Sequence, residues 1–260
     1  MQPVPAASAP AARHPRLDAW RGAAIVWMAA FHFCFDLNLY GFLIPRQVFN
    51  VDPFWTLQRS LIVSMFLLGA GAGQAAALAA GQTWPRFWRR WAQVAGCAVA
   101  VSIGSRLMFP VSWISFGVLH GMAAMLLLLR VLGVAIGPAR RSGAALAGLL
   151  AVAAAAWVLP HVFTHPFFDS RWTNFTGLVT KLPVTEDYVP VLPWLGMMLA
   201  GFAGAGWLLA HRPALLAGPL PVALGPLAAL GRWSLSFYMV HQPVLIGLVL
   251  LARMYRTMPG

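Results

Sequence analysis

Residues 16–40 read RLDAWRGAAIVWMAAFHFCFDLNLY, and this stretch decides the class of the protein. From residue 19 to residue 40 it is apolar for long enough to cross a lipid bilayer as a helix, which takes about 20 residues. A signal peptide is followed by a cleavage site of small residues, and this stretch is not. We therefore expect residues 19–40 to remain in the protein as a transmembrane helix.

The rest of the chain has the same character. Of its 260 residues, 60% are hydrophobic and only 9% are charged, and the mean hydropathy is +0.73. About a quarter of the residues of a soluble domain are charged, so this composition excludes a water-soluble enzyme. We predict an all-α, polytopic membrane helix bundle of about seven transmembrane helices, forming one domain over residues 16–260. The six further predicted spans are residues 54–79, 92–109, 116–132, 144–163, 191–210 and 233–252.

The charge pattern predicts which end of the chain is cytoplasmic. Lys and Arg number 18 against 6 Asp and Glu. With the N-terminus inside, most of these cations fall on the cytoplasmic side, as the positive-inside rule requires. The Pro/Ala-rich residues 1–15 are then a disordered cytoplasmic lead. Residues 215–230 are apolar but contain three prolines, and we expect an interfacial or re-entrant piece there; if it spans, the count becomes eight.

Three ionisable residues share one face of the first predicted helix. Arg21, His32 and Asp36 are separated by eleven and four residues, steps that return to nearly the same side of a helix. Ionisable groups inside a span are costly and mark candidate functional sites. Because His32 and Asp36 are one turn apart, the carboxylate can orient the imidazole to accept a proton from a hydroxyl or amine. The sequence predicts a catalytic pair, His32 and Asp36; a polar pair that only joins helices is an equal alternative.

Other polar groups lie inside predicted spans. His120 lies early in the fourth span, and His241 and Gln242 precede a proline in the last. Such residues more often bond one helix to another than line a cavity. The two cysteines lie in apolar runs, so we expect no disulfide framework, and we predict no metal site.

The stretch from Trp84 to Trp91 combines arginines with aromatic residues. In a soluble protein this pattern would suit single-stranded nucleic acid, but between two spans it is typical of an interfacial anchor, and we expect no nucleic-acid partner. The guanidinium groups of Arg86, Arg89 and Arg90 suit the phosphates of a cytoplasmic, nucleotide-bearing donor.

Three stretches carry a family resemblance: residues 16–38 with the Arg21-x10-His32 spacing, the Phe-Gly-Val-Leu-His-Gly of residues 116–121, and residues 230–243. Over about residues 16–250 the chain resembles bacterial relatives of the heparan-alpha-glucosaminide N-acetyltransferase catalytic domain, within the transmembrane acyltransferase superfamily. The spacing is the one that acyltransferase-3 proteins show.

The resemblance implies a multi-pass enzyme of the inner membrane that moves an acyl group, with acetyl expected, from cytoplasmic acyl-CoA to a hydroxyl or amine of a sugar or glycoconjugate. His32 would be the catalytic histidine. In the heparan enzyme that histidine lies in the first luminal connector, and residues 46–55 here contain none, so either His32 serves or the chemistry differs. Arg21 and Arg232 would join the arginines of the basic stretch in binding the donor. The expected substrate pocket comprises Asn38, Arg106, His120, Tyr238, His241 and Gln242.

Two other functions fit the same residues. Intramembrane histidines such as His32, His120 and His241 would suit a haem-b electron carrier. Alternatively, Arg21, His32 and Asp36 would suit a proton-coupled transporter. Besides the lipid bilayer, acyl-CoA and the acceptor, the sequence leaves a homo-oligomer open as a partner.

Overall fold

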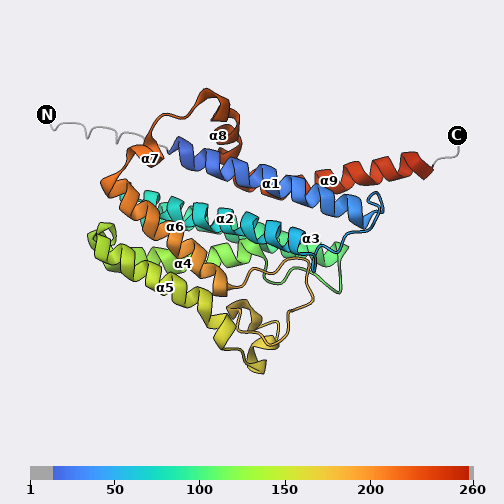
Figure 1. Ribbon diagram of the computed structural model, residues 1–260, viewed down its shortest axis with the longest axis horizontal. Helices are drawn as coiled ribbons and strands as arrows, with labels where there is room; N and C mark the ends of the chain where they lie inside the picture. Colours follow the sequence, from blue (N-terminus) through green and yellow to red (C-terminus); the bar gives the residue numbers. More distant parts are fainter. Residues whose placement is uncertain (1–13, 258–260) are drawn as a thin grey trace.

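The computed structural model describes residues 14–257, and residues 1–13 and 258–260 lie outside it. The predicted lead, residues 1–15, therefore falls almost wholly outside the described residues. Between residues 14 and 257 the structure has helices and no β-strand, which confirms the all-α class (Figure 1). The long helices are α1 (Pro15–Leu39), α2 (Pro53–Ala79), α3 (Trp84–Met108), α4 (Val118–Ile136), α5 (Gly143–Val162), α6 (Val191–His211) and α9 (Ser234–Thr257); the short ones are η1 (Gly137–Arg141), η2 (Pro166–Asp169), η3 (Asn174–Thr176), α7 (Ala214–Ala217), η4 (Val222–Leu224) and α8 (Gly225–Arg232).

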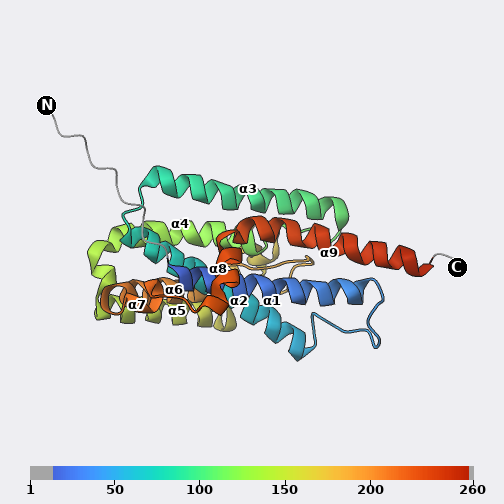
Figure 2. The ribbon, with the colours of Figure 1, turned by 90° about the horizontal axis from the view of Figure 1, so that it is seen from above.

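Among the described residues, six helices are long and apolar enough to cross a membrane: α1, α2, α4, α5, α6 and α9. The seventh predicted span, residues 92–109, lies in α3, which runs beside α4 (Figure 2). That helix begins earlier than expected and takes in the basic stretch, with Pro85 in its first turn, where proline is tolerated. α3 is not among the six. The chain is a multi-pass membrane protein.

The proline-rich segment at residues 215–230 does not form a continuous helix. It divides into α7, η4 and α8, and its longest apolar helical piece, Val222–Arg232, is too short to span. α8 packs on α1 (Figure 1). A Cβ on Gly22 would lie 1.9 Å from the Leu227 carbonyl oxygen, and one on Gly231 would lie 1.8 Å from that of Asp18. The two backbones meet because both positions are glycine.

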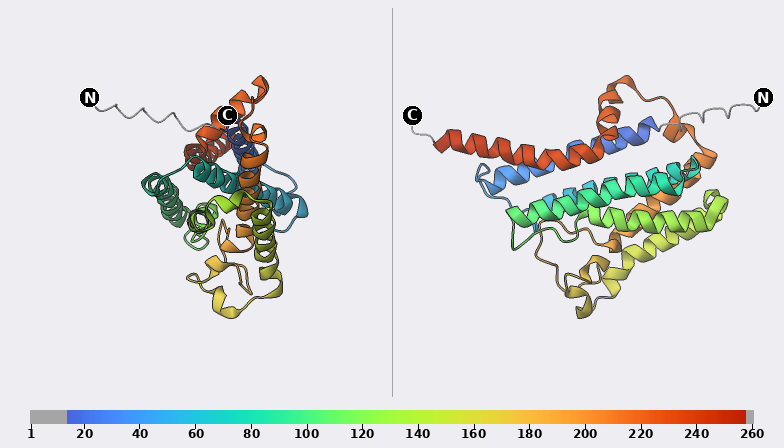
Figure 3. Two further views of the ribbon diagram at one scale, coloured as in Figure 1. Left: turned by 90° about the vertical axis from the view of Figure 1, so that its left-hand side faces the viewer. Right: turned by 180° about the vertical axis from the view of Figure 1, so that it is seen from behind.

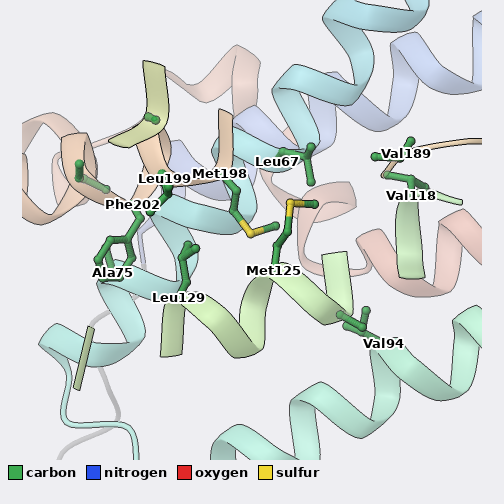
Figure 4. Close-up of a cluster of buried hydrophobic side chains, with 14 of the residues drawn as sticks. Leu67, Ala75, Val94, Val118, Met125, Leu129, Val189, Met198, Leu199 and Phe202 are labelled. Atoms are coloured by element: carbon green, nitrogen blue, oxygen red, sulfur yellow. The ribbon is translucent and has the colours of Figure 1, made fainter. Parts of the chain in front are cut away.

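The largest apolar core lies between α2, α4 and α6 (Figure 4), where Leu67, Met125, Met198 and Phe202 are almost fully buried. α6 also packs along α5. α1 begins at one end of the bundle and α9, lying beside α1, ends at the other (Figure 3). This places α1 and α9, which carry the predicted polar groups, next to each other.

The long connector between α5 and α6 folds back onto the start of α4. Asp187 accepts a hydrogen bond from the backbone N–H of Val118 at 2.7 Å. Burial raises the pKa of the Asp187 carboxyl above its ordinary value, against the lowering effect of that N–H. The Asp169 carboxylate accepts from the hydroxyl and backbone N–H of Thr180, and these bonds lower the pKa of Asp169.

Candidate active site

Two histidines from adjacent helices meet at the centre of the candidate site. His32 Nδ1 on α1 lies 2.7 Å from His241 Nε2 on α9. Their rings are stacked, with centroids 5.0 Å apart and planes 14° from parallel. His241 is buried and His32 is half-buried. The structure therefore brings together a predicted catalytic residue and a predicted pocket residue that are 209 positions apart in sequence.

The contacts of His241 set the hydrogen positions of both rings. His241 Nδ1 lies 2.7 Å from the Tyr238 carbonyl oxygen, which can only accept a hydrogen bond. In the neutral pair, His241 therefore carries its hydrogen on Nδ1 and accepts at Nε2 from the Nδ1–H of His32. This leaves His32 Nε2 with a free lone pair. The arrangement gives His32 the form that a general base requires.

The expected pairing of His32 with Asp36 is wrong. Asp36 is 1% exposed, and its two carboxylate oxygens accept from Gln242 Nε2 at 2.9 and 3.1 Å. Within residues 14–257, no hydrogen bond or ion pair joins Asp36 to His32. The reason is that α9 presents His241 and Gln242 in succession, so His32 and Asp36 each bond across to α9. Asp36 joins helices, as the alternative interpretation held.

Arg21 borders a polar cavity at the beginning of α1. This cavity, here called the vestibule, has a volume of about 380 Å³. Arg21 Nη1 lies 3.3 Å from an Asp18 carboxylate oxygen, and Nη2 donates to the Gly69 carbonyl at 3.4 Å. A Cβ on Gly73 would lie 2.2 Å from Arg21 Nη2, so this glycine makes room for the guanidinium group. The vestibule is lined by His14, Leu17, Asp18, Arg21, Gly73, Ala76, Arg90, Gly231 and Arg232.

A second cavity of about 240 Å³, the inner chamber, shares Arg21, Gly73 and Arg90 with the vestibule. It extends between α2, α3, α4 and α9 as far as Tyr238, and most of its wall is apolar. The lining of the two cavities does not include His32 or His241. Tyr238 borders the chamber, and its ring centroid is 5.6 Å from that of His241. Tyr238 therefore contacts both the chamber and a member of the histidine pair.

The structure divides the predicted donor-binding arginines into two groups. Arg21, Arg90 and Arg232 line the vestibule. Arg86 and Arg89 are exposed and line neither cavity. Because the basic stretch is helical, only one of its three arginines faces the vestibule.

Three predicted pocket residues are engaged elsewhere. The side-chain amide of Asn38 donates to and accepts from the backbone of Gln47, at 2.9 and 2.8 Å, and so closes the α1–α2 connector. Arg106 donates to the Pro110 carbonyl at 2.7 Å. His120 Nε2 bonds Ser102 Oγ at 3.1 Å and ties α4 to α3. They do not line either cavity.

Sequence reasoning missed most of the lining residues, among them the polar side chains of His14, Gln74 and Gln82. His14 precedes α1, and its Nδ1 is buried without a hydrogen-bond partner. Gln74 and Gln82 line the inner chamber. Gln74 carried a usable signal, since it is one of only two glutamines within the predicted span 54–79, where polar side chains are unusual.

The profile of the family described as "Heparan-alpha-glucosaminide N-acetyltransferase, catalytic" matches residues 13–243. The chain belongs to this family. The match confirms the resemblance and covers both cavities and the histidine pair. No curated protein and no solved structure matches the chain. Membership of the heparan-alpha-glucosaminide N-acetyltransferase catalytic family indicates a membrane-embedded acetyltransferase, and every described element of the candidate site lies within the matched residues.

Proposed function

We propose that this chain transfers an acetyl group from acetyl-CoA, taken from the cytoplasmic side of the inner membrane, to a hydroxyl or amine of a sugar or glycoconjugate. One observation carries the proposal: an arginine-lined vestibule shares lining residues with a chamber, and Tyr238, which lines that chamber, is in ring contact with the hydrogen-bonded pair of His241 and His32. The family supports acetyl transfer, and the donor, acceptor and sidedness are our inference.

The vestibule suits the nucleotide part of the donor. Arg21, Arg90 and Arg232 bring three guanidinium groups to one cavity, and guanidinium groups bind phosphate oxygens through paired hydrogen bonds. The phosphates of CoA would lie there. The arm that carries the thioester would extend along the inner chamber, with its acyl end beside Tyr238.

In the proposed reaction, His32 accepts the proton of the acceptor hydroxyl or amine. The acceptor oxygen or nitrogen attacks the thioester carbonyl carbon, and His32 Nε2 takes the acceptor's proton as the new bond forms. The carbon–sulfur bond then breaks, and the protonated His32 returns the proton to the departing CoA sulfur. The imidazolium is stabilised by donating from Nδ1 to His241 Nε2, whose own Nδ1–H stays on the Tyr238 carbonyl.

Tyr238 lines the chamber and is in ring contact with His241. In the mechanism that we propose, the Tyr238 side chain turns to give the acyl end access to His32, and its hydroxyl donates a hydrogen bond to the developing oxyanion. Arg106 and Gln242, two other expected pocket residues that could donate to an oxyanion, are engaged elsewhere: Arg106 bonds Pro110 and Gln242 bonds Asp36. Tyr238 is the one that borders the chamber.

The contacts favour this function over the two alternatives. Axial histidines on opposite faces of a haem are separated by the iron and its ring, whereas the nitrogens of His32 and His241 are in direct contact at 2.7 Å. A proton relay from Arg21 through His32 to Asp36 would need contact between the last two, and Asp36 is bonded to Gln242 instead.

The test uses purified protein in liposomes. Radiolabelled acetyl-CoA is added outside, with an amino sugar or a simple sugar inside or outside, and labelled product is counted. We expect product that depends on protein and on acetyl-CoA. Acceptor flux without acetylation would support transport, a Soret band in the purified protein would support haem, and either result without acetyl transfer would overturn the proposal.

A further inference from the structure

Two glutamines interrupt the apolar wall of the inner chamber. Gln74, on α2, is 6% exposed, and its side-chain nitrogen Nε2 is buried without a hydrogen-bond partner. Gln82, between α2 and α3, has a buried side-chain oxygen Oε1 without a partner. Buried polar groups are normally hydrogen-bonded, so each unpaired one needs an explanation.

The unpaired atoms have complementary chemistry. Gln74 offers a donor and Gln82 an acceptor, while a secondary amide carries one N–H donor and one C=O acceptor. The terminal torsion of a glutamine side chain is soft, so either amide can turn toward the chamber at little cost. The remaining wall, which includes Phe66, Leu119 and Met122, suits methylene and methyl groups. A chain that alternates amides with short alkyl pieces matches this surface.

Gln82 is held firmly in place. Its backbone carbonyl accepts from Arg130 Nη2 at 2.7 Å, and the Arg130 guanidinium, 2% exposed, lies 4.7 Å from the centre of the Trp84 ring. The turn that carries Gln82 is thereby fixed to α4 and to the start of α3. The backbone of Gln82 is thus already fixed before a ligand binds, and only its side-chain torsions are left to be ordered on binding.

We propose that Gln74 and Gln82 bind the amide groups of a pantetheine arm, and that the chamber thereby selects thioesters carried on such an arm. This inference rests on the proposed function, in which the donor is an acyl-CoA. It makes the two glutamines specificity residues for the donor, distinct from the arginines that bind its phosphates. The same chamber discriminates against acetyl thioesters whose thiol carries no amide.

The experiment measures the binding of two probes to detergent-purified protein. Acetyl-CoA contains the arm, and adenosine 3′,5′-bisphosphate represents the nucleotide end without it. The variants Gln74→Met and Gln82→Met replace each amide by an unbranched apolar side chain of similar length. The matched control is Gln93→Met, because Gln93 is exposed on α3 and lines neither cavity.

We expect each chamber variant to raise the Kd for acetyl-CoA about tenfold, the effect of losing one hydrogen bond to a buried partner. The Kd for the bisphosphate should stay within twofold of wild type, and the control should leave both constants unchanged. Unchanged binding of acetyl-CoA by both variants would overturn the inference while leaving the proposed function intact. An equal loss for both probes would also overturn it, since it would indicate general damage to the cavities.

Wild-type protein that binds neither probe would overturn the proposed donor itself, which separates that failure from a failure of the glutamine assignment. A thermal melt of each variant shows whether it is folded. If Gln74→Met does not fold, Gln74→Leu together with Gln82→Met decides the question by the same two constants.

Discussion

His32 Nδ1 lies 2.7 Å from His241 Nε2, and His241 Nδ1 lies 2.7 Å from the Tyr238 carbonyl. A backbone carbonyl at one end thus fixes which nitrogen of His32 is free at the other. In many hydrolases a carboxylate performs this orienting task for a catalytic histidine. In the mechanism that we propose, the imidazole of His241 performs this task instead of a carboxylate.

Replacing His241 by Phe should keep the ring contact but remove the acceptor for His32 Nδ1–H. Both neutral forms of His32 then become populated, and a part of the enzyme presents N–H instead of a lone pair to the acceptor. We expect kcat to fall on the order of tenfold, equivalent to about 1.4 kcal/mol, with the KM for acetyl-CoA unchanged. His241→Gln, which restores an acceptor oxygen, should recover part of the loss. Equal rates for wild type and His241→Phe would rule out a positioning role.

Replacing Asp36 by Asn should leave most of the activity, because Asp36 bonds Gln242 and not His32. The new amide can also donate to Gln242 Oε1, which is buried without a partner. We therefore expect thermal stability equal to or above that of wild type. Asp36→Leu is the contrast: it leaves the Gln242 amide unpaired and should cost about 1–3 kcal/mol. If Asp36→Asn were as inactive as a His32 variant, the carboxylate would be part of the base after all.

Arg90 and Arg86 provide a matched pair for the donor site. Both are exposed arginines near the start of α3, and only Arg90 lines the vestibule. We expect Arg90→Gln to raise the KM for acetyl-CoA about tenfold at low salt, since a charge-assisted hydrogen bond contributes about 1.5 kcal/mol or more. Arg86→Gln should have a KM within twofold of wild type. The same KM change in both variants would remove the vestibule from donor binding.

Asp187 and Asp169 should change stability with pH in opposite directions. Burial raises the pKa of the Asp187 carboxyl. The folded protein therefore holds the Asp187 proton more tightly than the unfolded chain does. Wild type loses stability as pH rises from the ordinary Asp pKa of 3.8 through the raised pKa of Asp187. Asp187→Asn keeps an acceptor for Val118 N–H and avoids this loss. In thermal melts it should be more stable than wild type at pH 7, with the difference disappearing in acid.

Asp169 is the control with the opposite sign. The bonds from Thr180 lower its pKa, so its ionised form stabilises the fold above the ordinary Asp pKa, and that stability is lost as pH falls through the lowered value. Asp169→Asn should therefore melt below wild type at pH 7 and match it in acid. Parallel shifts of both variants with pH would contradict the two assignments.

Hydropathy and spacing predicted most of the fold and part of the site. Apart from the start of α3 and the end of α9, the apolar runs located the long helices within a few residues. The prolines at positions 219, 221 and 226 correctly indicated that residues 215–230 do not form a continuous span. The basic stretch was predicted as a connector, because its arginines interrupt the apolar pattern from which the helices were predicted. In the structure it is the first part of α3. Residue spacing on one helix correctly placed His32 and Asp36 on one side.

Residue spacing on one helix cannot predict which other helix packs against the side that carries His32 and Asp36. The partners of His32 and Asp36 come from α9, more than 200 positions away, and only the packing of α9 on α1 decides that His241 and Gln242 reach them first. The cavities likewise depend on how α2, α3, α4 and α9 meet. For this reason Arg90 and Arg86 look equivalent in sequence and differ in the structure.

The central claim is that His32 is the general base, and the most direct test compares the rate of acetyl transfer by His32→Ala with that of wild type. The rate is measured with radiolabelled acetyl-CoA at a saturating concentration. Thermal melts show whether both proteins are folded. General-base catalysis contributes about 10²- to 10⁴-fold, so we expect His32→Ala to lose that factor in kcat while its Kd for acetyl-CoA stays within twofold. A His32→Ala enzyme that transfers acetyl at the wild-type rate would show that the base lies elsewhere.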